Sequence, residues 1–257
     1  MAAQIIDIAG VNLECYEAGQ GRATLYLHGG EGFAPEQPFV PLLAKSRRLI
    51  APSHPGFGRS GLPDWLDQMD DIAYIHMELL DRLELFQVDM VACGVGGWIA
   101  GEMATKAPER FRRIALSGPV GVKVGRPDRL DVPDVFAMPE KEVEKLLFHD
   151  PERFRFDPAA MSDEAVSVRL RNRETLALLS WEPYMHNPKL KQRLHRVRSP
   201  VLLLRGSGDG VVSSDYLAGY ARLFADARTG SVARAGHLAH LEQPQDFAEA
   251  VLTFLDA

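Results

Sequence analysis

Short apolar runs alternate with longer amphipathic runs along most of the chain. Residues 5–10 and 13–19 each end in Gly and predict an opening hairpin. Apolar side chains at helical spacing predict helices over 70–85 and 242–257. Further strands are predicted by buried-type runs at 23–30, 47–58, 86–93, 111–119, 199–209 and 229–237. Alternation of this kind is typical of βαβ units and a mostly parallel sheet.

The pattern changes between residues 121 and 194. This region has many Pro and charged residues and no clear strand, and its periodicity predicts helices over 139–150 and 162–181. We therefore expect an α/β core domain made of residues 1–120 and 195–257, with residues 121–194 as a helical cap. Ligands of such sheets lie outside the carboxyl ends of the strands, so the cap should cover the site.

Composition and charge exclude several classes of function. The 257 residues are 46% hydrophobic and 25% charged, which is near the average for globular domains, and contain no long apolar stretch that suggests a membrane span. A net charge of -6 argues against nucleic-acid or membrane partners, which favour a basic face. The N-terminus has no secretory pattern and there are two Cys, so we expect a cytoplasmic protein without disulfides. The oligomeric state stays open.

Four motifs follow predicted strands. They are LHGGEG at 27–32, SHPGFGRS at 53–60, VACGVGG at 91–97, and the late pair LLLRGSGDGVV at 202–212 and ARAGHLAHLEQP at 233–244. In this order they resemble the α/β-hydrolase fold family, over nearly the whole chain. The resemblance implies a mostly parallel twisted sheet flanked by helices, with a helical cap insertion.

The same resemblance assigns roles to particular residues. It implies an oxyanion hole made by the backbone N–H groups of Gly30 and Val95, and an acid–base pair made by Asp209 and His237. His240, in the same motif as His237, is expected to face the following helix or solvent. Ser53 stands where many relatives carry Asp, so no role is assigned to that turn.

The nucleophile position is occupied by a residue that cannot attack. The family's nucleophile elbow needs small residues two positions before and after the nucleophile, and alignment on Ala92 and Gly96 places Gly94 there. A register shifted to Cys93 would put Val residues at both small positions. Cys93 is therefore interpreted as a buried apolar residue.

Three interpretations of this pattern stay open. In the first, water occupies the space left at Gly94, His237 activates it, and the oxyanion hole polarises a small apolar carbonyl or ester substrate; in a variant His237 takes a proton from the substrate itself. In the second, the chain is a non-catalytic small-molecule-binding protein. In the third, Gly94 is an engineered replacement of Ser in a serine hydrolase. We favour the first.

The cap is expected to supply an apolar pocket, and no cofactor is expected. Candidate pocket residues are Phe136, Phe148, Trp181 and Tyr184, although side chains of this kind also pack a cap onto a core. The Gly residues of the elbow partly imitate a dinucleotide motif, but its third Gly would fall on Ile99. No motif has the His spacing of a metal site.

Overall fold

The central strands of the sheet are apolar because both of their faces are covered. In the computed structural model, which describes residues 3–257, all six residues of β5 are buried. The eight strands lie in the order β1-β2-β4-β3-β5-β6-β7-β8. β2 is antiparallel to β1 and β4, and the remaining pairs are parallel. The strands are β1 Ala3–Ile8, β2 Val11–Ala18, β3 Arg22–Leu27, β4 Arg47–Pro52, β5 Val88–Cys93, β6 Phe111–Ser117, β7 Val201–Gly206 and β8 Ala227–Val232. The predicted hairpin and parallel sheet are confirmed.

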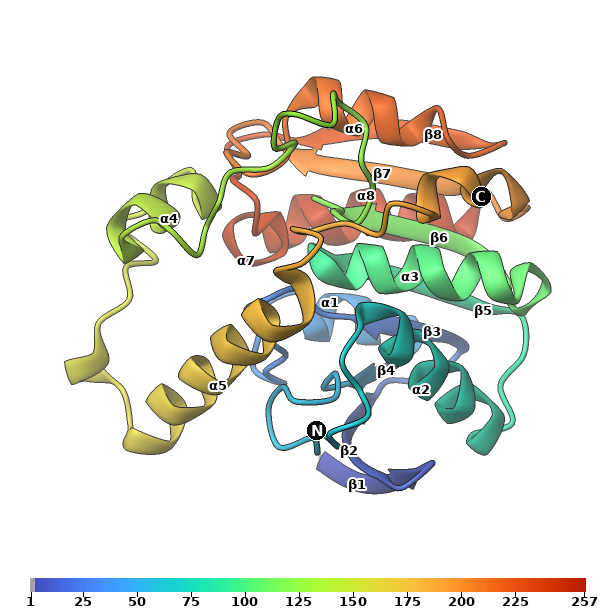
Figure 1. Cartoon of the computed structure of the whole chain (residues 1–257). Helices are drawn as coiled ribbons and strands as arrows, with labels where there is room; N and C mark the ends of the chain where they lie inside the picture. The colour runs from blue at the N-terminus through green and yellow to red at the C-terminus, as the bar shows by residue number, and fades with distance from the viewer. Residues whose placement is uncertain (1–2) are drawn as a thin grey trace.

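Helices cover both faces of this sheet (Figure 1). Those of the core are α1 Val40–Ala44, α2 Met69–Arg82, α3 Val95–Lys106, α6 Ser214–Ala221, α7 Ala239–Glu242 and α8 Pro244–Asp256. Buried residues of α2, α3 and α6 belong to one apolar cluster, and those of α1 and α8 belong to another on the opposite face. The two-residue period of β5 divides its side chains between them: Met90 and Ala92 join the first cluster, Val91 and Cys93 the second.

The segment between β6 and β7 is helical, as predicted. It contains α4 Glu140–Leu147, α5 Asp163–Ser180 and short 3₁₀ turns, and among the described residues it has no strand. α4 and α5 lie beyond the end of the sheet to which the arrow of β7 points (Figure 1). The segment therefore stands over the carboxyl ends of the parallel strands; its boundaries as a separate cap domain stay a prediction.

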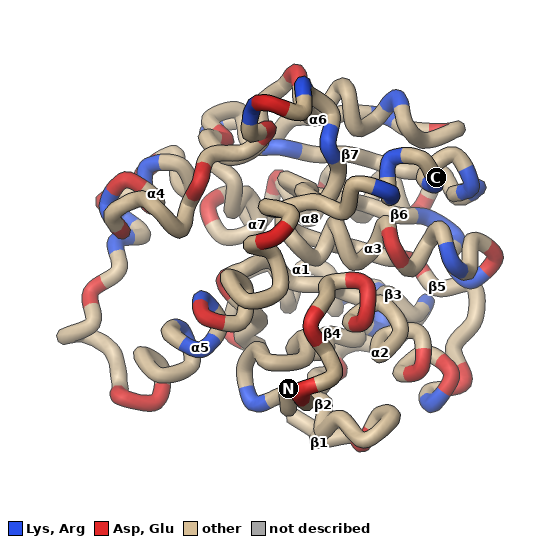
Figure 2. The backbone as a smooth tube through the Cα atoms, in the orientation of Figure 1, with Lys and Arg blue, Asp and Glu red and all other residues tan. Residues whose placement is uncertain are grey.

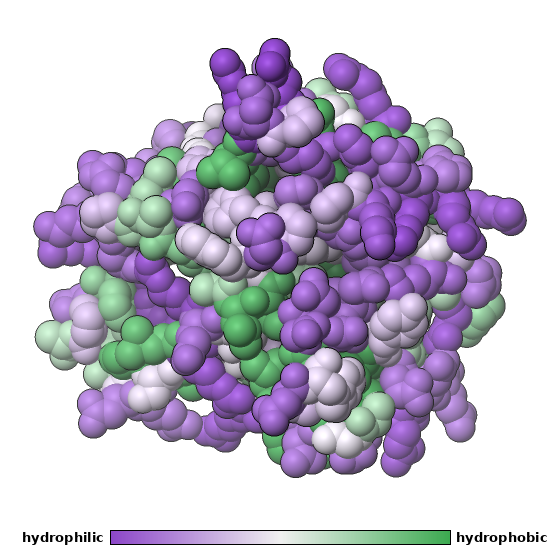
Figure 3. Space-filling model, in the orientation of Figure 1, coloured by the Kyte–Doolittle hydropathy of each residue, from purple (hydrophilic) through white to green (hydrophobic). Residues whose placement is uncertain are grey.

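Charged residues of both signs are mixed along the backbone. Figure 2 shows Lys and Arg interspersed with Asp and Glu over the part of the chain that the structure describes. None of the helices in residues 3–257 combines the length and the apolar character needed to cross a membrane. The surface seen in Figure 3 is mostly hydrophilic, with apolar side chains gathered over α5, where Leu170 and Leu178 are exposed.

Candidate active site

Gly94 forms a sharp turn between β5 and α3. Its φ of 53° and ψ of -120° lie in a region that costs an L residue about 1–3 kcal/mol. Its N–H donates to the carbonyl of Ser117 at 3.0 Å, and its carbonyl accepts from Gly97 at 3.0 Å and Val120 at 3.2 Å. These bonds hold the turn in a strained conformation of the kind that a nucleophile elbow requires, and Gly94 itself has no side chain.

The space at Gly94 differs from the space at Gly96. A Cβ on Gly96 would lie 2.3 Å from the carbonyl oxygen of Leu27, so the close approach of that strand requires glycine. A Cβ on Gly94 would lie 3.4 Å from Gly29 Cα and 3.5 Å from Nε2 of His237, which is ordinary van der Waals contact. The missing side chain at Gly94 therefore leaves a space that faces an imidazole nitrogen.

His237 and Asp209 are in contact, although 28 positions separate them in the chain. Nδ1 of His237 lies 3.2 Å from both carboxylate oxygens of Asp209. Oδ1 of Asp209 also accepts from the N–H groups of Val211 at 2.9 Å and Val212 at 2.8 Å. Burial raises the pKa of Asp209, but His237 and these N–H groups outweigh it and hold the pKa below its usual value. Burial alone would lower the pKa of His237; Asp209 reverses this and raises it.

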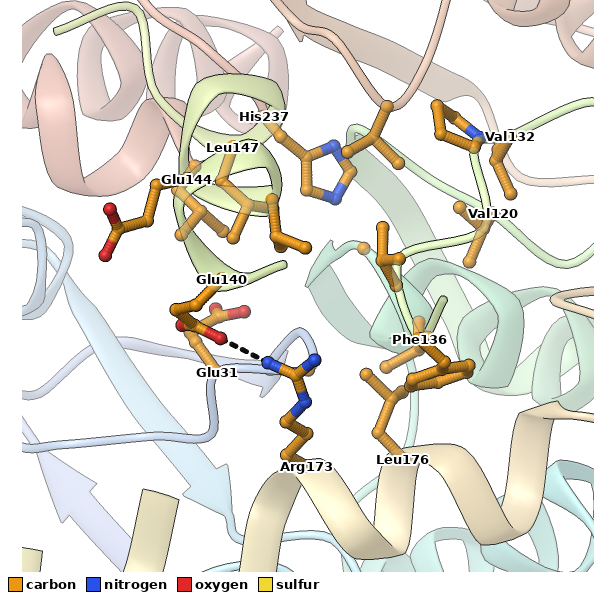
Figure 4. Close-up of a pocket in the computed structure, with 18 of the residues that line it drawn as sticks. Glu31, Val120, Val132, Phe136, Glu140, Glu144, Leu147, Arg173, Leu176 and His237 are labelled. Carbon is orange, nitrogen blue, oxygen red and sulfur yellow. Dashed lines mark hydrogen bonds and ion pairs between the residues drawn. The ribbon is translucent and has the colours of Figure 1, made fainter. Parts of the chain in front are cut away.

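A cavity of about 220 Å³ opens in front of His237 (Figure 4). Gly30, Gly94 and Val95 line its floor, and the walls include Phe136, Phe148 and Tyr184. Trp181 does not line the cavity: its side chain is 53% exposed and its ring packs beside those of Phe136 and Tyr184, at 5.9 and 6.4 Å. Trp181 directly follows the last residue of α5, and at that position its side chain is directed toward solvent.

The cavity also has charged walls that the sequence analysis did not single out. Arg169 and Arg173, one turn apart on α5, both pair with Glu140 of α4. Figure 4 shows Arg173 and Glu140 across the cavity from His237. Two guanidinium groups share the Glu140 carboxylate, and the carboxylates of Glu31 and Glu144 also line the cavity. The spacing of the two arginines was the available signal, but it did not reveal which way that helix face points.

A second imidazole–carboxylate pair lies at the oxyanion turn. Nε2 of His240 is 3.1 Å from Oε1 of Glu31, which also accepts from Gly29 N–H at 3.3 Å. Glu31 lines the cavity, whereas His240 is fully buried against Phe247 of the following helix. The expectation that His240 faces the following helix is confirmed, and the alternative of solvent is wrong.

His240 and Glu31 shift each other's pKa. Burial lowers the pKa of His240, but the neighbouring Cys93 and Glu31 outweigh it and raise that pKa to about 10. Burial raises the pKa of Glu31, but His240 outweighs it and holds the pKa below 4.5. The pair is therefore an ion pair at neutral pH.

We expect the stability lost in His240→Gln to depend on pH. The raised pKa of His240 gives a contribution fully present below pH 6.5 that disappears as the pH rises through about 10, and the lowered pKa of Glu31 gives one present above pH 4.5. The loss, about 3 kcal/mol for a buried pair, should be greatest between pH 4.5 and 6.5 and should become smaller as the pH rises toward about 10. Urea denaturation at pH 5.5, 7.5 and 9.5 measures it, with the exposed His195→Gln as the matched control. An equal loss at all three pH values would contradict the ion pair.

Other candidates occupy structural positions. Cys93 is buried on the α1 and α8 face, with Tyr26 Oη 3.6 Å from its Sγ, and it does not line the cavity. Ser53 donates to Oε2 of the buried Glu14 at 3.0 Å, which secures its turn. Among residues 3–257 no group of three or more His, Cys, Asp or Glu is arranged to hold a metal ion.

Curated proteins similar to this chain include two bacterial hydrolases. The chain is 27% identical to a 2-hydroxy-6-oxo-2,4-heptadienoate hydrolase of Pseudomonas putida, over 99% of this chain and 96% of the relative. It is 29% identical to a 2-hydroxymuconate semialdehyde hydrolase of a Pseudomonas species, over 97% of this chain and 92% of the relative.

Solved structures share the fold. A 2-hydroxy-6-oxo-6-phenylhexa-2,4-dienoate hydrolase from Rhodococcus superposes with a TM-score of 0.76 at 23% identity, over the full length of both chains. A bacterial membrane phospholipase A gives a TM-score of 0.81 at 20% identity, over 99% of this chain and 86% of the other. The family model for the alpha/beta hydrolase family matches residues 25–250. By this match and by its sheet and elbow, the chain belongs to the α/β hydrolase family.

Proposed function

We propose that the protein is a hydrolase of a small, largely apolar carbonyl compound or ester, and that water takes the place of the covalent nucleophile. The observation that carries this proposal is that Nε2 of His237 faces the space left at Gly94, inside a cavity. A water molecule in that space is within reach of an imidazole whose other nitrogen contacts Asp209. Such a base contributes about 10²–10⁴-fold to the rate of a reaction that it assists.

The proposed mechanism is direct addition of water to the substrate carbonyl, followed by elimination of the leaving group. The N–H groups of Gly30 and Val95 polarise the substrate carbonyl, and His237 takes a proton as the water oxygen attacks the carbonyl carbon. Collapse of the tetrahedral intermediate expels the leaving group, which receives that proton from the imidazolium. Asp209 stabilises the imidazolium while it carries the proton. No bond between protein and substrate forms at any step, because Gly94 has no side chain.

The lining of the cavity supports a substrate with an acidic end. Apolar residues of the cap segment make up most of the walls, and Arg173, which shares the Glu140 carboxylate with Arg169, lies across the cavity from His237. A carboxylate there would gain charge-assisted hydrogen bonds, and a carbonyl several atoms away would reach the Gly94 space. The names of two relatives describe dienoates, which are carboxylates of this general form.

A pair of matched esters tests both parts of the proposal. The p-nitrophenyl monoester of glutaric acid carries a terminal carboxylate that p-nitrophenyl hexanoate lacks. We expect turnover of both, with a lower KM for the glutarate ester, and Arg173→Met should raise that KM by about 10- to 100-fold. The KM for the hexanoate ester should stay the same in Arg173→Met.

The control is Arg228→Met, which removes the same charge from an exposed position on β8. It should leave both KM values unchanged. An equal effect of Arg173→Met on the two esters would contradict recognition of a carboxylate by that guanidinium. Absence of turnover of either ester, thioesters and lactones by the wild-type protein would contradict the hydrolase itself and favour a binding protein.

A further inference from the structure

The end of helix α4 is hydrogen-bonded to both loops of the proposed acid–base pair. The carbonyl of Leu146 accepts from the N–H of Gly210 at 3.0 Å, immediately after the acid. The carbonyl of Leu147 accepts from the N–H of Leu238 at 3.2 Å, immediately after the histidine. The segment that covers the cavity is thus bonded to the two loops beneath it.

The backbones at these contacts approach too closely for side chains. A Cβ on Gly210 would lie 2.8 Å from Leu146 Cα, and a Cβ on Gly236 would lie 2.4 Å from the carbonyl oxygen of Leu147. Both glycines are therefore required by the position of α4.

One buried carboxylate joins α4 to the histidine loop. Glu242 is 5% exposed, and its oxygens accept from His149 N–H at 2.9 and 3.0 Å and from Asp150 N–H at 3.0 Å, just beyond α4. Its Oε2 also accepts from Gly236 N–H at 2.5 Å, next to His237. Among the described residues no cation pairs with Glu242. These three N–H groups are therefore the partners that compensate for its burial.

We propose that Glu242 is a positioning residue that holds the loop of His237 against the end of α4. The inference rests on the proposed function for its catalytic consequence. α4 itself lines the cavity through Glu140, Val143 and Leu147. The wall that contacts substrate and the base that activates water are thus joined by the Glu242 carboxylate, in addition to the backbone hydrogen bonds of Leu146 and Leu147.

Two variants break this link from opposite sides. Glu242→Gln keeps the shape of the side chain but replaces one acceptor with an amide NH₂, which cannot accept from N–H groups. His149→Pro removes the N–H donor on the α4 side, and Phe148 already has the extended φ of -122° and ψ of 143° that a residue before proline prefers. Glu249→Gln, at an exposed position on α8, is the matched control. If Glu242→Gln fails to fold, the same measurements on His149→Pro test the proposal.

Hydrogen exchange tests the link without any turnover. Amides at 146–150 and at 236–238 should exchange at least about 10-fold faster in each variant. The reason is that both segments are held by hydrogen bonds to Glu242, which each variant weakens. Exchange that increases only at 146–150 would overturn the proposal, and so would no change in either segment. The control should match the wild type.

The titration of His237 and the kinetics complete the test. In both variants the raised pKa of His237, followed by NMR, should move toward its ordinary value of 6.5 as its contact with Asp209 loosens. Turnover should show kcat reduced by about 10- to 100-fold with a smaller change in KM, since a misplaced base acts on the chemical step. An unchanged titration and kcat would overturn the proposal. If the wild type hydrolyses no ester, the proposed function fails, whereas exchange and titration still decide the role of Glu242.

Discussion

Replacing His237 with Ala is expected to lower ester turnover by about 10²–10⁴-fold, the usual contribution of a general base. The reason is that, apart from its chain neighbours Cys93 and Val95, His237 is the one described residue with a side-chain atom within 4 Å of a Cβ at Gly94, so it is the group placed to accept the proton of water there. Steady-state turnover of the glutarate and hexanoate esters measures the effect. His195→Ala, at an exposed position, is the control and should retain full activity. Activity that survives in His237→Ala would contradict the proposed mechanism.

The pH profile gives the same prediction a second readout. Burial lowers the pKa of His237 and Asp209 more than reverses this, so the neutral imidazole predominates only above the ordinary value of 6.5. The wild-type kcat/KM should therefore rise with pH through a value above 6.5. Asp209→Asn removes the group that raises this pKa, so its much weaker activity should rise at lower pH. If the wild-type kcat/KM rises at a pH near or below 6.5, another group is the base.

Replacing Gly94 with Ser is expected to convert the site to covalent catalysis. The Cβ of the new side chain would fit at 3.4 Å from Gly29 Cα and 3.5 Å from Nε2 of His237, so its hydroxyl can meet the base. We expect ester turnover to increase by about 10²-fold or more, because a positioned hydroxyl is an intramolecular nucleophile whereas water must be captured and oriented. A burst of p-nitrophenol and labelling by a serine-directed fluorophosphonate would accompany it.

Gly94→Ala distinguishes the effect of adding a nucleophile from the effect of filling the space at Gly94. Both variants impose a Cβ on a backbone with φ of 53°, so both should lose about 1–3 kcal/mol of stability. Ala fills the proposed position of the water without supplying a hydroxyl, so it should lose the wild-type activity and resist the fluorophosphonate. An Ala variant as active as the wild type would contradict water at this position. Labelling of the wild type would show that the nucleophile lies elsewhere.

Much of the fold was predictable because its signals are local. Period-2 and period-3.6 patterns act within one element, and they located the hairpin, the parallel strands and the helices between β6 and β7. The glycines of the elbow form a local sequence motif, although the reason that Gly96 must be glycine is the approach of the Leu27 carbonyl in another strand. The position of Gly94 at the turn followed from that spacing.

The cavity walls were less predictable because a helix has several faces. Phe136, Phe148 and Tyr184 line the cavity, whereas Trp181 points outward from the same segment. α5 has no strong separation of apolar and polar sides, and both Leu176 in the cavity and the exposed Leu178 belong to it. Its orientation depends on its contacts with the turns after β3 and β4 and with α4, which no pattern within the helix records.

The sequence by itself determined the fold, the sharp turn at Gly94, and the strand ends after which Asp209 and His237 stand. Only the tertiary structure decided that His237 faces the space at Gly94, that Glu31 binds a histidine 209 positions away, and that Glu242 joins α4 to the histidine loop. The physical reason is the distance along the chain over which each effect acts. Backbone periodicity and glycine geometry act over a few residues, whereas a buried carboxylate takes its partners from wherever the packed chain brings N–H groups and imidazoles within about 3 Å.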